Sequence, residues 1–599
     1  MGCGCISVEI KDRDYQDRIY APKVGLDLNI RRRYLVLVIG ILIMFSGTIL
    51  AASVQSAFGS VAVTEVDFQA ADGSMIHSTL QKPNYATSSD PLPGVVVIHG
   101  SLQNKEWVMG FGIELARRGF VVLTIDANGH GNSEAGSGSG TAALDYITSL
   151  DYVDDTQIGL IGHSMGGGIS WSAINESSVY VRALVLVGSG FWSTASYTPN
   201  TLLATGDFDS LSSYPHNITL LEPYFNETGI VEGVTYGDFA SNTARKAIFP
   251  STNHLFETID PVIIGESVEW MKNSLKGGVE DEHWIASTNQ IYSLWLFGGL
   301  LGLIGALLTI FPIIAILLST PLFNDLRGIP TDEPTKSRSI ISRGTIYGLI
   351  GAGSFFPMLL VGTLLQYMIP FPQYNGLPVM SWMIGSGLIA FLVLIPVLYF
   401  HVRRKESVLV ALRRLFGVGE GRVVSWFKTL IVTLIVFIWM YALTLLVDLG
   451  LVLDLRCFLP GLHDLTLAQA GLVPLYFVVF LVFFIVEGAW LTGVMLPESE
   501  GSWMRVQLNW TIKGVLVKTF PYLILILFEF VGGFLAGRAL VPGIIGYSWL
   551  FFYAFTPWFA VCTVITMYGY RMTGNRWLGA MMNAMLCAWL LASILSFRG

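Results

Sequence analysis

The residues Gly-His-Ser-Met-Gly at 162–166 place a serine between two glycines, directly after an apolar run. Such flanks suit a sharp turn from a strand into a helix, because Gly162 and Gly166 leave room where side chains would clash. The turn lifts the Ser164 hydroxyl above the edge of a sheet, at the N-terminus of the next helix. A serine hydroxyl is a poor nucleophile at neutral pH and needs an adjacent base. The motif therefore predicts nucleophilic chemistry, provided that a base reaches Ser164.

The segment 54–287 around this motif alternates short apolar runs with helix-length stretches. That alternation is typical of a sheet flanked by helices. An opening hairpin is expected with Asp72-Gly73 at its turn, and the residues after 259 predict a final helix packed on the sheet. The strands between them are expected at 94–100, 120–126, 156–164, 181–190, 201–207 and 244–250.

Five short motifs follow these strands in order. They are His-Gly-Ser at 99–101, "DANGHGNS" at 126–133, "GHSMG" at 162–166, "GDFD" at 206–209 and Asn-His at 253–254. With them, the chain resembles the α/β-hydrolase superfamily over about 60–275, particularly its esterase, lipase and dienelactone-hydrolase-like branches. The resemblance implies a mostly parallel sheet flanked by helices, with the catalytic residues in the chain order Ser, Asp, His.

The resemblance also implies roles for individual residues. His254 lies in a loop between a strand and a helix and is the expected base. Asp209 stands where the superfamily has the acid that orients this histidine, with Asp207 as the alternative. Four other histidines are interpreted as structural or solvated: His99, His130, His163 and His216.

By the same resemblance, the backbone N–H groups of Met165 and Ser101 form the oxyanion hole. This chemistry implies no metal ion and no organic cofactor. Only 191–200 separates the sixth strand from the strand before the acid, so no substantial helical cap fits there. We therefore expect an open site, unless the loop 210–243 or the membrane part covers it.

The remainder of the chain is predicted to be a polytopic bundle of about nine transmembrane helices. Apolar runs of about 18 residues or more with few charges are long enough to span a bilayer. They are expected at roughly 34–53, 291–318, 345–368, 380–400, 429–449, 472–495, 516–537, 545–569 and 578–597.

The distribution of basic residues predicts how these spans are oriented. Arg31, Arg32 and Arg33 precede the first span and place the N-terminus in the cytoplasm. Alternation from there puts 16 Lys and Arg of the region after 287 in inner loops and only Arg456, Arg538 and Arg598 outside. The predicted organisation is a cytoplasmic tail at 1–33, an anchor at 34–53, an extracytoplasmic hydrolase domain at 54–287 and a membrane domain of about eight helices at 288–599.

Two features of the N-terminus leave alternatives. The first span could be a cleaved signal peptide, but more than thirty residues precede it, which favours a retained anchor. Gly2 is a candidate for myristoylation and Cys3 or Cys5 for palmitoylation, but Ile6 departs from the usual motif. We expect a short cytoplasmic tail without these modifications.

Charge separates the two regions further. Between 54 and 287 there are 26 Asp and Glu against 9 Lys and Arg, which argues against a nucleic-acid partner. Within the spans, Glu487 and Glu529 are carboxyls at expensive positions. They are interpreted as buried hydrogen-bond partners of each other or of Asn583, with an ion relay or a head-group pocket as the alternative.

The sequence as a whole predicts a multi-pass cell-membrane serine hydrolase that acts on small-molecule or lipid esters in contact with the bilayer. One alternative is a transporter or receptor that uses the hydrolase-like domain as a binding module. Another is a peptidase or thioesterase, since the same triad serves these reactions. The sequence leaves the natural substrate, the oligomeric state and any protein partner undetermined.

Overall fold

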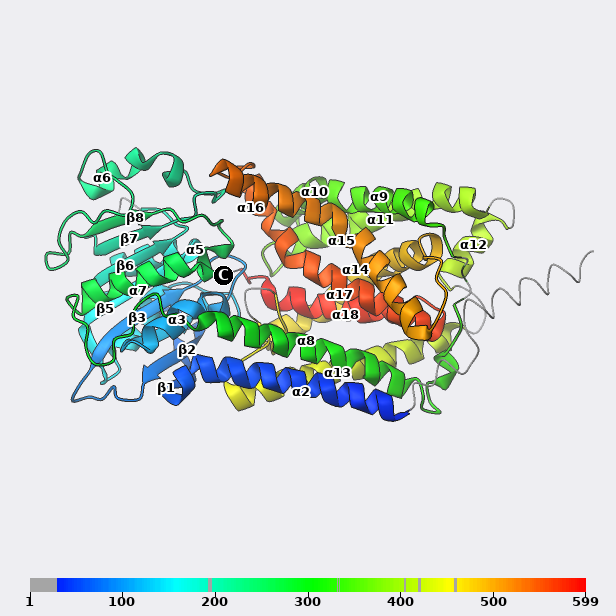
Figure 1. Ribbon diagram of the computed structural model, residues 1–599, viewed down its shortest axis with the longest axis horizontal. Helices are drawn as coiled ribbons and strands as arrows, with labels where there is room; N and C mark the ends of the chain where they lie inside the picture. Colours follow the sequence, from blue (N-terminus) through cyan, green and yellow to red (C-terminus); the bar gives the residue numbers. More distant parts are fainter. Residues whose placement is uncertain are drawn as a thin grey trace, which may run out of the picture.

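The computed structural model describes residues 30–191, 197–330, 332, 334–402, 406–417, 422–456 and 460–598 (Figure 1). The expectations for the N-terminal tail with Gly2, Cys3 and Cys5 lie outside these residues. The described chain forms two parts that lie end to end, an α/β part and a helical bundle. We call them the sheet domain and the bundle.

The sheet domain is built on an eight-stranded sheet with the order β1-β2-β4-β3-β5-β6-β7-β8. The β1–β2 and β2–β4 pairs are antiparallel, and every later pair is parallel. The expected hairpin is present, with Asp72 and Gly73 between its two strands. The strands are β1 (Val61–Gln69), β2 (Met75–Pro83), β3 (Leu92–Ile98), β4 (Val121–Ile125), β5 (Val153–His163), β6 (Val181–Val187), β7 (Asn200–Ala204) and β8 (Arg245–Ile248).

Helices cover both faces of this sheet, since its central strands are apolar on both sides. In β3, Val95 and Val97 pack on the face covered by α3 and α7. Val96 and Ile98 pack on the opposite face, against α4 and α5. The helices of the sheet domain are α3 (Met109–Ala116), α4 (Ser139–Thr148), α5 (Met165–Glu176), α6 (Glu222–Phe225) and α7 (Pro261–Leu275).

Within the described residues, nine helices of the bundle are long and apolar enough to cross a membrane. They coincide with the nine expected runs, although the third is broken at Ser354 into two helices. The bundle helices are α2 (Ile30–Gln55), α8 (Tyr292–Leu317), α9 (Ser337–Gly353), α10 (Phe355–Met368), α11 (Gly376–Val402), α12 (Val408–Leu415), α13 (Arg422–Leu451), α14 (Leu467–Ala489), α15 (Trp503–Ala536), α16 (Ile544–Ser548), α17 (Leu550–Thr573) and α18 (Trp577–Ile594).

The first helix joins the bundle although the sheet domain separates it from the others in sequence. α2 packs along α8, and the Arg33 guanidinium donates a hydrogen bond to Ala315 O at 2.9 Å. Near the sheet domain, Trp295 Nε1 donates to Gln55 Oε1 at 3.0 Å. The apolar core on the α3 and α7 face of the sheet runs on without a break into α2 and α8. The sheet domain is therefore held at both of its chain ends.

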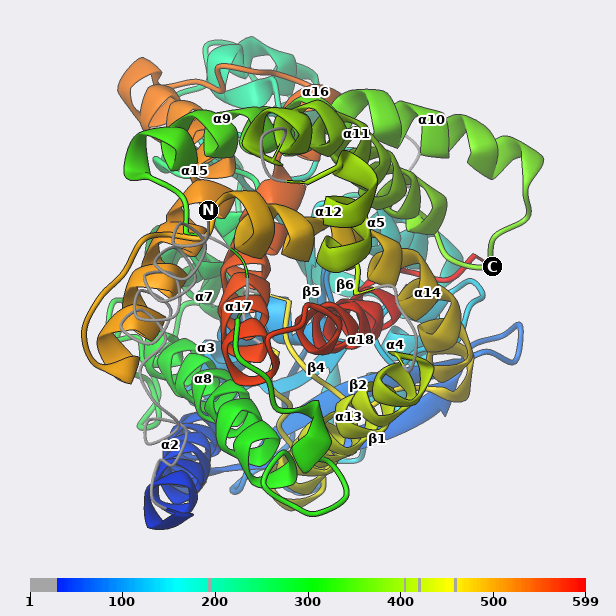
Figure 2. The ribbon, with the colours of Figure 1, turned by 90° about the vertical axis from the view of Figure 1, so that its right-hand side faces the viewer.

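The edge of the sheet domain at the carboxyl ends of the parallel strands faces the bundle (Figure 1). Seen along the long axis, α17 and α18 stand in the middle of the bundle, in front of the sheet (Figure 2). The chain ends beside this edge, where Phe597 N donates to Gly129 O at 2.7 Å. Gln469 Nε2 donates to Gly131 O at 2.7 Å, and Gly543 N donates to Ser210 O at 2.6 Å. Hydrogen bonds to backbone carbonyls of the sheet domain thus hold the two parts together.

Candidate active site

The turn that carries Ser164 joins β5 to α5. Ser164 has φ 52° and ψ −115°, a conformation that non-glycine residues rarely adopt. A Cβ on Gly162 would lie 2.3 Å from Gly166 O, and one on Gly166 would lie 2.3 Å from Ile98 O. Both are backbone atoms that cannot move aside, so only glycine fits on either side of this serine.

The structure brings Ser164, His254 and Asp209 together from three loops at the same edge of the sheet. The Ser164 hydroxyl lies 2.9 Å from His254 Nε2, and His254 Nδ1 lies 3.0 Å from Asp209 Oδ2. The second oxygen of Asp209 accepts a hydrogen bond from Leu211 N at 2.7 Å. Since that carboxylate can only accept, His254 donates from Nδ1 and is left to accept the serine proton at Nε2.

Asp207 takes a different direction from Asp209. Its Oδ2 accepts a hydrogen bond from Ser251 Oγ at 2.9 Å. Asp207 is partly exposed, whereas Asp209 is buried against His254. The geometry therefore favours Asp209 over Asp207 as the acid.

A second buried carboxyl, Glu257, lies beside His254 and was missed in the sequence. Its Oε2 is 3.5 Å from His254 Nδ1 and 3.4 Å from His163 Nε2, while its Oε1 accepts from Gly206 N at 2.7 Å. Burial and the charge of Asp209 raise the pKa of Glu257 to about 8, so its neutral form predominates at pH 7. The one signal in the sequence was an acid three positions after the candidate base.

The environment of His254 favours its charged form. Burial lowers the pKa of His254, but the charge and hydrogen bond of Asp209 and the charge of Glu257 outweigh it and raise that pKa to about 9. The interactions that raise this pKa would also stabilise the imidazolium formed if His254 took a proton from Ser164.

The His99-Gly100-Ser101 segment lies against the serine turn. A Cβ on Gly100 would lie 3.0 Å from Ser164 Cβ. Gln103 Oε1 fixes the segment by accepting from Gly100 N and from His163 Nδ1, both at 2.9 Å. Ser101 and Ser164 line the same cavity, and Met165, the residue after Ser164, begins α5. Both proposed oxyanion donors therefore flank the nucleophile.

His163, His254 and Glu257 place ligand atoms within 4.8 Å of one another, close enough to hold a metal ion. Both nitrogens of His254 already face Asp209 and Ser164, and those of His163 face Gln103 and the carbonyl of His254. A bound ion would compete with these hydrogen bonds and with the proton transfer from Ser164.

Comparison with known proteins agrees with this arrangement. Residues 89–213 match the family described as "Serine aminopeptidase, S33". This match lies within the sheet domain and contains the serine turn in its parallel sheet. The sheet domain is an α/β-hydrolase domain.

Individual relatives are similar to this hydrolase domain. A bis(hydroxyethyl) terephthalate hydrolase of Streptomyces coelicolor is 28% identical over 234 residues, 38% of this chain and 70% of that protein. Lipase 1 of a Moraxella strain is 32% identical over 112 residues, 18% of this chain and 35% of that protein. Among solved structures, a bacterial heroin esterase is 18% identical with a TM-score of 0.28 and covers 36% of this chain and 85% of its own. An esterase of Pyrococcus furiosus is 14% identical with a TM-score of 0.29, covering 37% and 96%.

The bundle covers one side of Ser164. A cavity of about 70 Å³ opens at Ser164 and His254 and is closed by residues of the bundle. The sequence left three possibilities, namely an open site, cover by the loop 210–243 and cover by the membrane part, and the last describes this side. The bundle residues that line the cavity are Pro460, Ala554, Phe555, Ile594 and Leu595.

The two carboxyls within the spans have partners other than those expected. Glu487 is buried in α14, where its Oε2 lies 2.5 Å from Lys518 Nζ and accepts from Tyr347 OH at 2.8 Å. The sequence predicted Lys518 in an inner loop, but it lies buried inside α15. A buried charge is costly, which favours the pairing of Lys518 with Glu487. The expectation that these carboxyls pair with each other or with Asn583 is therefore wrong for Glu487.

Glu529 lies in α15 near the hydrolase domain, and its Oε1 is 3.5 Å from Val541 N. Asn583 instead donates to Cys562 O at 2.9 Å and to Thr566 Oγ1 at 2.8 Å, both in α17. The contacts of Glu487 join α9, α14 and α15, which accords with a structural role for this carboxyl.

Proposed function

We propose that this protein is a membrane-bound serine hydrolase that cleaves carboxylic esters through an acyl-enzyme at the outer face of the membrane. One observation carries the proposal, namely the continuous hydrogen-bonded line from Ser164 through His254 to Asp209, with distances of 2.9 and 3.0 Å. This arrangement activates a serine for acyl transfer.

In the first step, Ser164 Oγ attacks the ester carbonyl and His254 Nε2 takes the serine proton. The N–H groups of Met165 and Ser101 stabilise the negative oxygen of the tetrahedral intermediate. The bond between the carbonyl carbon and the alcohol oxygen then breaks, and the alcohol leaves with the proton that His254 returns. Asp209 holds the imidazolium in place throughout.

In the second step, water replaces the alcohol beside His254. His254 removes a proton from this water while the water oxygen attacks the acyl carbon. The bond between the acyl carbon and Ser164 Oγ then breaks. The proton returns to Ser164, and a carboxylic acid is released. No other reactant is consumed, so the net change is hydrolysis of one ester bond.

The relatives support an ester as substrate over other acyl compounds. They include a bis(hydroxyethyl) terephthalate hydrolase and a lipase. The matched family, however, is described as a serine aminopeptidase. Peptide and thioester bonds are therefore the alternatives that a substrate test must contain.

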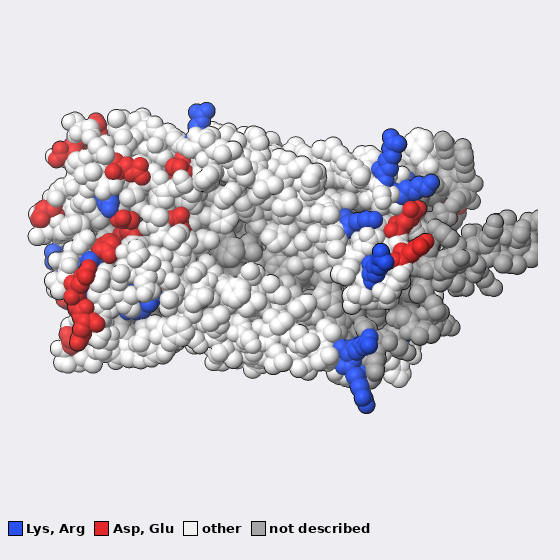
Figure 3. Space-filling view, viewed as in Figure 1, with Lys and Arg blue, Asp and Glu red and all other residues white. Residues whose placement is uncertain are grey.

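The proposed outer location is supported by charge. Lys and Arg side chains on the visible face lie mostly at the end of the bundle far from the hydrolase domain, whereas Asp and Glu gather on that domain (Figure 3). Positive residues accumulate on the cytoplasmic side of membrane proteins. We expect added protease to cleave the hydrolase domain in intact cells and to spare it in inverted vesicles; the reverse pattern would contradict the orientation.

A fluorophosphonate probe tests the chemistry directly, since it labels an activated serine. We expect the folded full-length protein to be labelled and to hydrolyse 4-nitrophenyl acetate, and Ser164→Ala to lose both activities. An aminoacyl 4-nitroanilide and an acyl thioester serve as competing substrates. A preference for either of these would replace the ester assignment. Equal labelling of wild type and Ser164→Ala would falsify the enzyme proposal and favour a binding module.

A further inference from the structure

Two cavities that differ in size and in polarity meet at Ser164. One is an outer cavity of about 1140 Å³, lined by Ser164 and Met165 and by the loop before α4. The other is the inner cavity of about 70 Å³ between the hydrolase domain and the bundle. Ser164 lines both, so a molecule bound at this serine has one path toward each.

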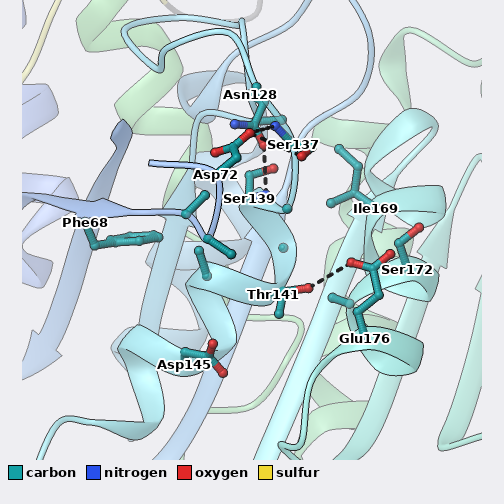
Figure 4. A pocket seen from close by; sticks show the side chains of 18 of the residues that line it. Phe68, Asp72, Asn128, Ser137, Ser139, Thr141, Asp145, Ile169, Ser172 and Glu176 are labelled. Carbon is teal, nitrogen blue, oxygen red and sulfur yellow. Dashed lines mark hydrogen bonds between the residues drawn. The ribbon is translucent and has the colours of Figure 1, made fainter. Parts of the chain in front are cut away.

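The outer cavity carries more polar side chains than the inner one. Figure 4 shows carboxylates and hydroxyls around it from α4, from α5, from the β1–β2 turn and from the loop before α4, with the ring of Phe68 from β1 beside them. Thr141 Oγ1 donates to Glu176 at 3.4 Å, and Ser137 N donates to Asp72 at 2.7 Å. The polar side chains that line it are Asp72, Asn128, Ser137, Ser139, Thr141, Asp145, Ser172 and Glu176.

The inner cavity is continued by an apolar space of about 30 Å³ within the bundle. The two share Pro460, Phe555 and Ile594 in their walls. Beyond these, the second space has no charged side chain among its lining residues, which come from α11, α14, α17 and α18. They include Met383, Phe480, Phe559 and Leu591.

We propose that the bundle is the acyl-binding part of the enzyme. The substrate would be an ester of an apolar acyl chain and a polar alcohol, with the chain in the inner cavities and the alcohol in the outer one. This inference rests on the proposed ester hydrolysis at Ser164 and adds the class of substrate. It also gives helices α11, α14, α17 and α18 a role in catalysis beyond anchoring the hydrolase domain.

The order of the two steps assigns the acyl chain to the inner side. The alcohol must leave, and water must arrive, while the acyl group is still bound to Ser164. The outer cavity is the larger and more polar of the two, so it suits both movements. The acyl chain stays in place during this exchange, and apolar walls stabilise it by keeping it out of water.

The size of the inner cavities sets the chain length. About 13 Å³ of such space admits one water-sized group, so the two together hold roughly seven methylene-sized groups. We therefore expect the best substrate to carry an acyl chain of about eight carbons, counting the carbonyl carbon bound to Ser164. Burying each methylene raises kcat/KM by about fourfold until the space is filled.

The experiment measures kcat/KM of the full-length protein in detergent for glycerol monoesters from acetate to palmitate. We expect a rise to a maximum near octanoate and a fall toward palmitate. Two substitutions move this maximum in opposite directions. Leu591→Trp fills the far space and should lower the octanoate-to-acetate ratio at least tenfold, whereas Phe555→Ala enlarges the two spaces where they meet and should favour longer chains.

The matched control is Leu449→Trp, which adds the same side chain to α13 at a position 82% exposed. We expect it to leave the octanoate-to-acetate ratio unchanged. A flat chain-length profile that still depends on Ser164 would overturn the acyl-binding role and leave the proposed hydrolysis intact. Hydrolysis that survives in Ser164→Ala would overturn the proposed function itself. If Leu591→Trp does not fold, as judged by fluorophosphonate labelling, the Phe555→Ala profile and the wild-type profile decide.

Discussion

At the scale of single residues, the site contains two buried carboxyls that face one imidazole. Asp209 holds the hydrogen bond to His254 Nδ1 at 3.0 Å, while Glu257 stands 3.5 Å from the same nitrogen. Two carboxylates this close cannot both ionise easily, so their protonation is divided between them. The raised pKa of Glu257 makes Glu257 the neutral member of the pair at pH 7.

The first prediction concerns pH. A general base must be neutral, and the pKa of His254 is raised to about 9. The value of kcat/KM should therefore rise as pH increases from 7 through about 9 and level off above it. Asp209→Asn removes the charge that raises this pKa. The rising limb of the plot of kcat/KM against pH should therefore move to lower pH, while kcat falls by roughly 10⁴. A profile with a limb below pH 7 in the wild type would contradict this account of His254.

The second prediction separates the two carboxyls. Gln has the shape of a protonated Glu, so Glu257→Gln should keep more than half of the wild-type activity at pH 7. Glu257→Ala leaves Gly206 N without its acceptor and should lower activity at least tenfold. Above pH 8 the wild-type Glu257 ionises and holds the proton on His254 more tightly. The limb of the Glu257→Gln profile should thus lie at lower pH than that of wild type; coincident limbs would remove Glu257 from the titration.

At the scale of elements, β5 and α5 act as one rigid unit that holds Ser164 at φ 52°. Packing of Gly166 against the backbone of β3 keeps this conformation, since nothing larger than hydrogen fits there. The loop that carries Asp209 is held from the other side. Its Phe208 packs edge-on against Phe530 of α15, with ring centroids 5.9 Å apart. Elements of both parts thus position the proposed catalytic residues.

The third prediction tests the serine turn. Gly166→Ala would place a Cβ 2.3 Å from Ile98 O, so the turn must shift. We expect a loss of about 1–3 kcal/mol in the free energy of unfolding and loss of fluorophosphonate labelling. Gly265→Ala in α7 is the matched control, because its Cβ meets the end of the Gln290 side chain at 3.1 Å and Ser287 O at an ordinary contact distance of 3.6 Å. Labelling of Gly166→Ala at the wild-type rate would show that the turn tolerates a side chain.

At the scale of the whole molecule, the bundle and the hydrolase domain share a buried charge cluster. Arg456, in the loop between α13 and α14, lies 2.5 Å from Asp454 and 3.2 Å from Glu106 of the hydrolase domain. All three are buried. Glu106 is close in sequence to Ser101, so this cluster connects the bundle to the segment beside the nucleophile.

The fourth prediction follows from that burial. Arg456→Ala would leave Asp454 buried without its cation and Glu106 with only Lys105, 3.5 Å away, and should cost about 3–5 kcal/mol of stability. The melting temperature in detergent, followed together with ester hydrolysis, measures the effect. Arg538→Ala removes an exposed arginine from the same side of the bundle and should change little. An unchanged melting temperature for Arg456→Ala would mean that water reaches the cluster.

The sequence by itself determined the features that arise from neighbours in the chain. The glycines around Ser164 report local steric limits, the alternating apolar runs report a sheet flanked by helices, and the long apolar runs report nine candidate spans. Only the tertiary structure decided what surrounds the serine. Three features depend on contacts between different elements. They are the place of Glu257 beside His254, the pairing of Glu487 with Lys518, and the cover that Phe555 and Ile594 form over Ser164. Such contacts leave no periodicity or spacing in a single sequence, because packing between elements fixes them.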